Sequence, residues 1–227
     1  MKIGVLFVLF YQGMLCVNAQ IVDIPDYNFK NDLVNTLCVD IDRDGIADDD
    51  VDTNNDGKIQ LSEAKAVLWL DISKSSTTPD RQKVRSLEGI EAFSNLTSLW
   101  VSHNLLEELD VANQSNLKTL LCFNNKLSVL DVTQSPNLEF LGIIANPLQE
   151  LSVPQNPNLE VLLCVMDDMA ELNVNRSPFL SHLILGSSSW EVFDNSNGLT
   201  LICSNKNMDT LYTSNDAKLE GAFCSGN

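Results

Sequence analysis

The chain has 227 residues, with 31 acidic and 14 basic side chains and a formal net charge of −17. This excess of negative charge repels nucleic acid and anionic lipid and attracts cations. After residue 19 no segment is apolar enough to cross a bilayer. We therefore expect neither nucleic-acid binding nor membrane insertion.

Residues 1–19 are predicted to form a secretory signal peptide. One basic residue, Lys2, precedes an apolar run from Ile3 to Tyr11, and the small-residue site Val17-Asn18-Ala19 predicts cleavage after Ala19. A membrane anchor is the alternative interpretation, but the run is too short to span a bilayer and Gln12 interrupts it. The expected localisation is secreted, either extracellular or at the cell surface.

Residues 20–70 are predicted to form a small helical cap. Phe29, Leu33, Val34 and Leu37 recur at helical spacing shortly after Pro25, which indicates an amphipathic helix. A second helix is expected to run from 62 to 68. The segment between the two helices is rich in aspartate, and it carries the most specific motif of the chain.

A twelve-residue segment from Asp52 to Glu63 matches the EF-hand calcium loop at every defined position. In such a loop the oxygen ligands alternate, a central glycine, here Gly57, permits a sharp turn, and the last carboxylate binds with both oxygens. The predicted ligands to Ca²⁺ are Asp52, Asn54, Asp56, Lys58 through its carbonyl, and Glu63. The alternative is a solvated acidic loop.

The preceding segment begins a second loop of the same kind, but Val51 stands where the closing glutamate is expected. The candidate ligands are Asp40, Asp42, Asp44 and Asp48. Either Asp49, Asp50 or Asp52 closes this loop from a shifted register, or the loop binds no second ion. Without a cation, the mutual repulsion of so many aspartates favours disorder.

Residues 71–227 are predicted to consist of repeats of about 21 residues. Four units run without a gap from Asn95 to Pro178, and each reads Leu-x-x-Leu-x-apolar-x-x-(Asn/Asp)-x-(Leu/Met). The Leu-x-apolar pair has the period of a short β-strand, and one unit cannot bury the inward side chains of that strand alone. Neighbouring units are therefore expected to stack into a parallel sheet and bury these side chains for one another.

Two other positions of the repeat have a predicted structural role. The amide position is expected to hydrogen-bond backbone groups where the chain leaves the strand. It is occupied by Asn104, Asn125, Asn146 and Asp167. The second inward-facing position of the strand is interpreted as a core position, where cysteine packs as a small apolar side chain. It is occupied by Cys122, Cys164, Cys203 and Cys224, of which only the last two lie in adjacent units and leave a disulfide open.

The repeats become irregular after Pro178, and the last segment, Lys218 to Asn227, aligns with the first half of a unit. A solenoid that ends within a unit exposes an apolar end. Either this half-unit is a degenerate cap, or the chain is shorter than the full gene product.

The run Ile24-Pro25-Asp26, the calcium loop and the run from Leu87 to Leu99 together resemble secreted leucine-rich-repeat proteins of the Bacteroidetes type, which are distantly internalin-like. The resemblance covers essentially the whole chain after the signal peptide. It implies a leucine-rich-repeat horseshoe or arc with a parallel β-sheet, an irregular convex side and a small N-terminal helical calcium-binding cap. It also implies an extracellular or surface-associated binding protein.

The solvent side of the predicted sheet is the expected binding face. More than half of the residues that alternate with the core leucines are apolar, and a large exposed apolar patch generally marks an interaction site. The candidates are Trp100, Leu121, Phe123, Phe140, Ile144, Leu163 and Val165. A shifted inside/outside assignment, or a module that covers this face, is the alternative explanation.

The leading functional hypothesis is adhesion or binding of a protein or peptide. The alternative is a structural or carbohydrate-binding module of a surface complex, because aromatic side chains can stack on sugar rings. No enzyme is expected, because the two histidines, His103 and His182, lie in widely separated repeats and the usual hydrolase and phosphate-binding motifs are missing. A carboxylate pair for sugar hydrolysis is the alternative to that expectation.

Overall fold

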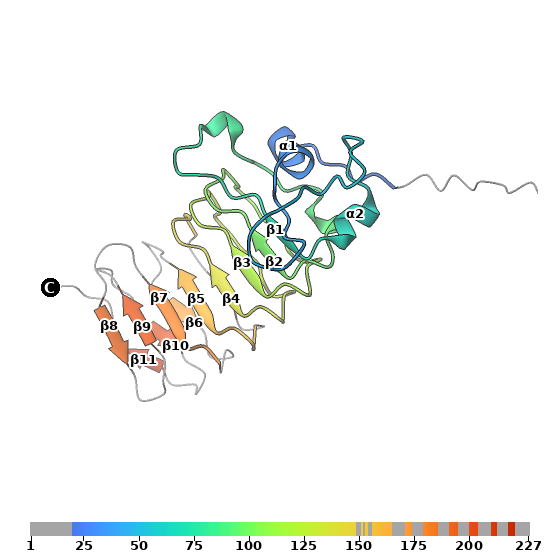
Figure 1. The fold of residues 1–227 in the computed structure, drawn as a ribbon. Coiled ribbons are helices and arrows are strands. Elements are labelled where there is room, and N and C mark those ends of the chain that lie inside the picture. The colour runs from blue at the N-terminus through green and yellow to red at the C-terminus, as the bar shows by residue number, and fades with distance from the viewer. Residues whose placement is uncertain are drawn as a thin grey trace, which may run out of the picture.

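The protein is an elongated β-solenoid in the computed structural model, which describes residues 20–148, 151, 153, 156–164, 171–173, 179–185, 191–194, 200–203, 210–212 and 218–220. The predicted signal peptide, residues 1–19, lies outside the described residues. Successive strands lie side by side, and two helices lie near the first strand (Figure 1). Within the described part of the chain, no helix has both the length and the apolarity needed to cross a membrane.

The main sheet places its described strands in the order β1-β2-β3-β4-β5-β7-β9-β8. In chain order, these strands are β1 (Trp69–Asp71), β2 (Ser98–Trp100), β3 (Thr119–Leu121), β4 (Phe140–Gly142), β5 (Val161–Cys164), β7 (His182–Leu185), β8 (Glu191–Asp194) and β9 (Thr200–Cys203). A second sheet has the order β11-β10-β6, with β6 (Glu171–Asn173), β10 (Thr210–Tyr212) and β11 (Lys218–Glu220). Two 3₁₀ helices, η1 (Asp80–Gln82) and η2 (Ile90–Ala92), lie in the loops around β1 and β2.

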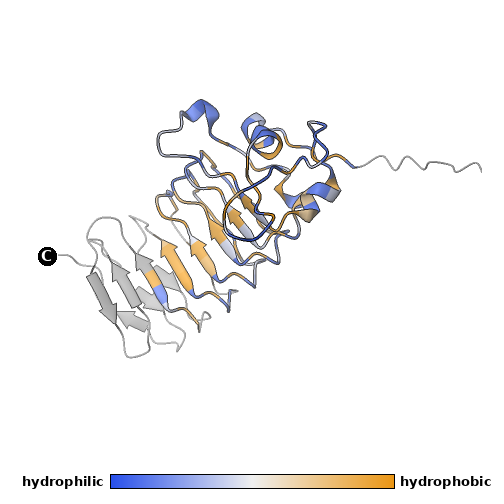
Figure 2. Ribbon diagram, in the orientation of Figure 1, coloured by the Kyte–Doolittle hydropathy of each residue, from blue (hydrophilic) through white to orange (hydrophobic). Residues whose placement is uncertain are grey.

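The predicted parallel stacking is confirmed from β1 to β9. One leucine from each of six successive strands occupies the same register position, and each of these side chains is 0% exposed. The row consists of Leu70, Leu99, Leu120, Leu141, Leu162 and Leu183. β5 is apolar along its whole length, as the hydropathy colouring shows (Figure 2). The strands therefore form one continuous core that no single unit could bury alone.

The C-terminal end of the main sheet departs from the simple repeat. β8 pairs with β9 in the antiparallel direction and forms the edge of the sheet. Only residues 195–199 connect the two strands, and a connection this short suits antiparallel pairing, whereas a parallel pair requires a long crossover. β11 is likewise antiparallel to β10, and residues 221–227 of the predicted last half-unit lie outside the described residues.

Two short helices form within the predicted cap segment. α1 (Tyr27–Asn35) begins after Asp26, whose carboxylate accepts a hydrogen bond from the backbone N–H of Phe29 at 2.9 Å. Phe29 and Leu33 face the core, but Leu37 lies beyond the end of the helix and is 66% exposed, so its predicted place on the helix face is wrong. α2 (Leu61–Ala66) begins at Gln60 with a reciprocal capping box between Gln60 and Glu63.

Polar contacts attach α1 to the loop that follows β1. The ammonium group of Lys74 lies 2.6 Å from both carboxylate oxygens of the buried Asp32. Burial raises the pKa of the Asp32 carboxyl, and the Lys74 ammonium partly offsets this effect. Beyond this ion pair, Asn28 donates to the backbone carbonyls of Arg81 and Lys83 at 3.1 and 2.8 Å. These contacts fix the helical segment against the first turns of the solenoid.

The predicted asparagine ladder is present wherever the structure describes it. Asn125 donates to the carbonyls of Val101 and Cys122 at 2.9 and 3.2 Å, and its side-chain oxygen accepts from the N–H of Leu106 at 3.1 Å. Asn104 and Asn146 make equivalent bonds one unit earlier and one unit later. Each amide therefore joins its own turn to the preceding one. Asp167, the fourth predicted member, lies outside the described residues.

The described cysteines are buried free thiols, as predicted for Cys122 and Cys164. Strand β4 lies between β3, which Cys122 directly follows, and β5, which carries Cys164, so the two sulfur atoms cannot form a disulfide. Burial raises the pKa of both thiols, which keeps them protonated and poorly reactive. The side chains of Cys203 and Cys224 lie outside the described residues.

We expect Asn125→Leu to lower the free energy of unfolding by about 3 kcal/mol, because it leaves several buried backbone groups without partners. Asn113→Leu provides the matched control, since Asn113 is exposed. Urea denaturation followed by circular dichroism measures both variants. Equal stability of the two variants would contradict a structural role for the ladder.

Candidate functional site

The first candidate site is the predicted calcium loop, and its side chains are turned into the loop. Asp52 is only 2% exposed, and its carboxylate accepts from the N–H groups of Asp56 and Gly57 at 3.1 and 2.7 Å. Glu63 reaches back across the loop and accepts from the Thr53 hydroxyl at 2.9 Å and the Gln60 N–H at 2.8 Å. Carboxylates from both ends of the loop therefore hydrogen-bond across it. The positive φ of 77° at Gly57 agrees with the sharp turn expected there.

Four of the five predicted ligands in this loop line one open pocket. They are Asn54, Asp56, Lys58 and Glu63. The side chain of Gln60 enters the same pocket, where it accepts from Asn54 Nδ2 at 2.6 Å and donates to both Asp56 oxygens at 3.2 Å. The fifth predicted ligand, Asp52, is held by the backbone bonds described above. Carboxylate and amide oxygens, the atoms that Ca²⁺ prefers, therefore line the pocket, but the carboxylates of Asp52, Asp56 and Glu63 do not all lie within 4.8 Å of one another.

The second acidic loop repeats the hydrogen bonding of the first at an offset of twelve residues. Asp40 accepts from the Gly45 N–H at 2.8 Å, as Asp52 does from Gly57. The next two bonds of the first loop, from Asp56 N–H to Asn54 and from Lys58 N–H to Asp56, also have counterparts here. These run from Asp44 N–H to Asp42 at 3.2 Å and from Ile46 N–H to Asp44 at 2.9 Å. The fourth residues, Arg43 and Asn55, both have a positive φ.

The carboxylates of the second loop come together only in part. Asp40, Asp42 and Asp48 each offer an oxygen within 4.8 Å of the others, whereas Asp44 is not in this group. Val51 is buried, as its apolar character requires, and donates its N–H to Leu33. Asp52 is committed to the first loop by its bonds to Asp56 and Gly57. Of the three residues considered for closing this loop, Asp49 and Asp50 therefore remain, and neither belongs to the group of converging carboxylates.

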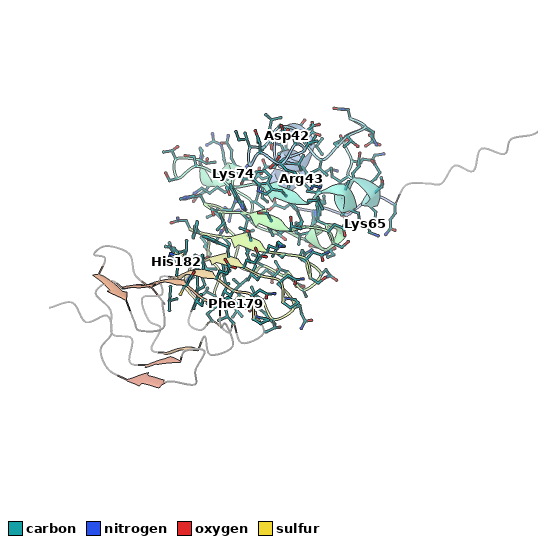
Figure 3. The ribbon with its side chains drawn as sticks, turned by 60° about the horizontal axis from the view of Figure 1, so that its bottom comes forward. Asp42, Arg43, Lys65, Lys74, Phe179 and His182 are labelled. Atoms are coloured by element: carbon teal, nitrogen blue, oxygen red, sulfur yellow. The ribbon has the colours of Figure 1, made fainter. Side chains whose placement is uncertain are left out.

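Within the part of the chain that the structure describes, no ion pair involves an aspartate of either loop. The loops are at the end of the molecule that carries the helices, where Asp42 and Arg43 lie far along the sheet from His182 (Figure 3). Burial raises the pKa of Asp50, and the neighbouring charge of Asp49 raises it further. The segment is therefore a concentrated field of negative charge with little internal compensation.

The second candidate site is the face of the main sheet that points away from the leucine core. Side chains on this face are half-buried in every described parallel strand from β1 to β5. Trp100, Leu121 and Leu163 share one register row, and Phe140 lies in the next. Ile144 follows β4 and is also half-buried, whereas Val165 lies outside the described residues. The inside/outside assignment made from the repeat is thus correct for these strands.

Trp69 is a further aromatic residue on this face, and the repeat analysis did not include it. Its ring lies 5.0 Å from that of Trp100, centroid to centroid, with an angle of 67° between the planes. The loop around η1 enlarges the unit that contains Trp69, so the 21-residue spacing fails there. The alternation in Trp69-Leu70-Asp71, with a buried leucine between two half-buried residues, is the signal that identifies the strand.

Phe123 lies across Gly142 on the neighbouring strand. A Cβ atom added to Gly142 would lie 2.5 Å from Phe123 Cζ and 2.9 Å from Leu121 Cδ2. Glycine at this position therefore leaves room for the phenyl ring of Phe123. Phe123 is half-buried, as are the other described candidates on this face.

No protein-family model matches the chain, and no curated protein matches it in sequence. Among solved structures, it is similar to the functional domain of InlJ from Listeria monocytogenes, which includes a cysteine ladder, with a TM-score of 0.63 and 28% identity. That match covers 84% of this chain and 39% of the InlJ chain. An internalin, InlF from L. monocytogenes 4b F2365, matches with a TM-score of 0.45 and 17% identity over 75% of this chain and 46% of that one. The InlJ match supports a leucine-rich-repeat solenoid fold similar to that domain, and this chain spans less than half of the length of either neighbour.

We expect Gly142→Ala to destabilise the chain by about 1–3 kcal/mol, because the new methyl group overlaps the Phe123 ring. In a Phe123→Ala background the same change is expected to cost much less. A double-mutant cycle measured by urea denaturation isolates this coupling. Additive effects of the two substitutions would show that the ring does not depend on the glycine.

Proposed function

We propose that this chain is a secreted or surface-associated binding protein that holds a protein or peptide partner on the exposed face of the main sheet. The observation that carries the proposal is the set of half-buried apolar side chains on this face: Trp100, Leu121 and Leu163 share one register row, in which Gly142 occupies the β4 position, and Phe140 lies in the neighbouring row. An apolar surface in register over several strands is a preferred place for association, because covering it removes a large apolar area from water.

Two further observations support this proposal. The aromatic members, Trp69, Trp100 and Phe140, belong to the residue types that most often anchor interfaces. The similarity to the InlJ domain places the chain among leucine-rich-repeat folds, and the predicted signal peptide at residues 1–19 agrees with export.

Carbohydrate binding is the second candidate, and the Trp69–Trp100 pair favours it. Exposed indole rings can stack on sugar rings. However, the two planes lie at 67° to each other, so the pair offers one ring face and one edge instead of a flat platform. The apolar row beyond the pair also extends further than a small sugar would need. A protein or peptide partner therefore accounts for more of the surface.

We also propose that Ca²⁺ binds the loop from Asp52 to Glu63 and stabilises the helical segment. The support is the full motif match, the pocket shared by four of the predicted ligands, and the high local density of aspartate. A second ion in the loop of Asp40, Asp42 and Asp48 is proposed on the repeated hydrogen-bond scheme and the convergence of these three carboxylates. Bound Ca²⁺ would supply positive charge to these aspartates, none of which belongs to an ion pair in the described part of the chain.

Calcium is expected to raise the melting temperature by roughly 5–10 °C when its concentration is about 100 times the Kd. Glu63→Gln removes one ligand charge, so it should abolish most of this increase. The glutamine retains an oxygen that can accept from the N–H of Gln60, so the melting temperature in the presence of a chelator should change little. Differential scanning calorimetry with and without Ca²⁺ measures both quantities. A wild-type chain with the same melting temperature in calcium and in chelator, and no heat on titration, would contradict the proposal.

Trp100→Ala and Phe140→Ala are expected to weaken partner binding by about 2 kcal/mol each, or about thirtyfold, and to leave the fold intact. Leu37→Ala is the matched control, because Leu37 is an exposed apolar residue outside the sheet. The chain is first used as bait to recover a ligand from extracellular and surface proteins, and a glycan array is run in parallel. The affinity of each variant for the recovered ligand is then measured. A ligand that binds both sheet variants as tightly as the wild type would place the site elsewhere, and recovery of a glycan alone would favour the second candidate.

A further inference from the structure

An apolar groove of about 510 Å³ lies outside the strands, on the segments that return the chain from one strand to the next. These segments come from the units of β1, β2 and β3. The floor of the groove includes Leu87, Ile90 and Leu109, which belong to the core, together with Val129, which is 61% exposed. None of the residues that line it belongs to the sheet face proposed above to bind a partner. The groove is therefore a separate surface.

The rim of this groove is acidic. The residues that line it include five carboxylates and no lysine or arginine. The five are Glu88, Glu91, Glu108, Asp110 and Asp131. None of them takes part in an ion pair within the described chain. The groove therefore combines an apolar floor with negative charge that no described cation neutralises.

Backbone hydrogen bonds hold three of these carboxylates in position. Asp110 and Asp131 each accept from the N–H two residues ahead at 2.8 Å, and Glu91 accepts from the Gly89 N–H at 2.9 Å. A parallel bridge joins Asp110 to Asp131, so the two carboxylates belong to neighbouring units of the stack. The hydrogen bonds to Thr133 lower the pKa of Asp131, so it carries its charge at neutral pH.

The spacing of the rim charges favours an extended ligand over a metal ion. In the part of the chain that is described, the one acidic group with oxygens within 4.8 Å of one another is Asp40, Asp42 and Asp48. The five rim carboxylates come from three successive return segments, so a single cation could contact few of them at once, whereas the ligands predicted for Ca²⁺ lie within one twelve-residue loop. A chain with several separate positive charges could pair with most of them.

We propose that the groove docks a basic amphipathic peptide segment of a partner protein. Its aliphatic side chains contact Val129, the large exposed apolar residue of the groove, and the small exposed parts of Leu87, Ile90 and Leu109, and its lysine or arginine side chains face the acidic rim. Apolar contacts supply affinity, and the complementary charges accelerate association and select against acidic segments.

The test uses the full chain and two fluorescein-labelled octapeptides, one of alternating lysine and leucine and one of alternating lysine and serine. Fluorescence anisotropy is measured in saturating calcium, so that the acidic loops do not compete for the peptide. The lysine/leucine peptide is expected to bind at least about tenfold more tightly than the lysine/serine peptide, and its affinity should fall strongly at about 0.5 M salt, where charges are screened. Equal affinity for the two peptides would overturn the proposal, because the apolar floor would then have no part in binding.

Matched variants locate the site. The double variant Glu88→Gln/Glu108→Gln is expected to lose about tenfold in affinity, because two exposed charge pairs are removed. Glu107→Gln is the control, because Glu107 is an exposed neighbour that does not line the groove. Val129→Ser should weaken the lysine/leucine peptide and leave the lysine/serine peptide unchanged. If Glu107→Gln or Asp42→Asn reduces binding as much as the double variant does, the peptide binds by general attraction to an acidic protein and the proposed site is wrong.

Discussion

The stability of this solenoid depends on the mutual burial of one leucine row. Each strand contributes one leucine to this row. Those from β2 to β7 are shielded by strands on both sides, and none of the six described members, Leu70 on the edge strand β1 included, is exposed to solvent. Burying one such side chain contributes about 2 kcal/mol relative to leaving it in water. Because the contacts are between neighbours, the loss of one unit would expose the apolar faces of two others. The requirement for stacking therefore sets the direction and spacing of the sheet.

The asparagine ladder supplies hydrogen-bond partners for the backbone groups that stacking buries where the chain leaves each strand. Backbone groups at these turns are buried, and an unpaired buried N–H or C=O costs about as much as a lost hydrogen bond. One amide donates and accepts across two turns, so a single residue type satisfies several of these groups in each unit. The same regularity keeps the sheet face uniform, which allows half-buried apolar residues to align in rows across it.

The distribution of charge separates the molecule into surfaces with different chemistry. The sheet face presents apolar side chains, the groove on the return segments presents an acidic rim over an apolar floor, and the N-terminal loops present dense aspartate. Lys74 is one of the few cations used internally, where it neutralises Asp32 and connects α1 to the solenoid. Most of the remaining acidic side chains face solvent, so cationic ligands are favoured wherever the surface also offers a binding shape.

The local and periodic features of this protein were determined by its sequence. The repeat of leucine, inward cysteine and asparagine is a nearest-neighbour pattern, and it predicted the parallel stack, the amide bonds and the buried thiols of Cys122 and Cys164. The spacing of Asp52, Gly57 and Glu63 predicted a calcium loop; its carboxylates accept backbone N–H groups within the loop, and its binding of Ca²⁺ stays a prediction. The predictions for the repeats succeed because they depend on residues within one unit or on identical contacts between adjacent units.

Features that depend on contacts across irregular segments were decided only by the tertiary structure. Trp69 joins the sheet face before a loop that breaks the repeat spacing, and the Phe123 ring occupies space that Gly142 on the next strand leaves open. The antiparallel edge strand β8 and the groove under the acidic rim also arise where units differ from one another. A repeat in the sequence describes what neighbouring units share, so it does not predict these differences between units. They depend on contacts that exist only in the folded chain.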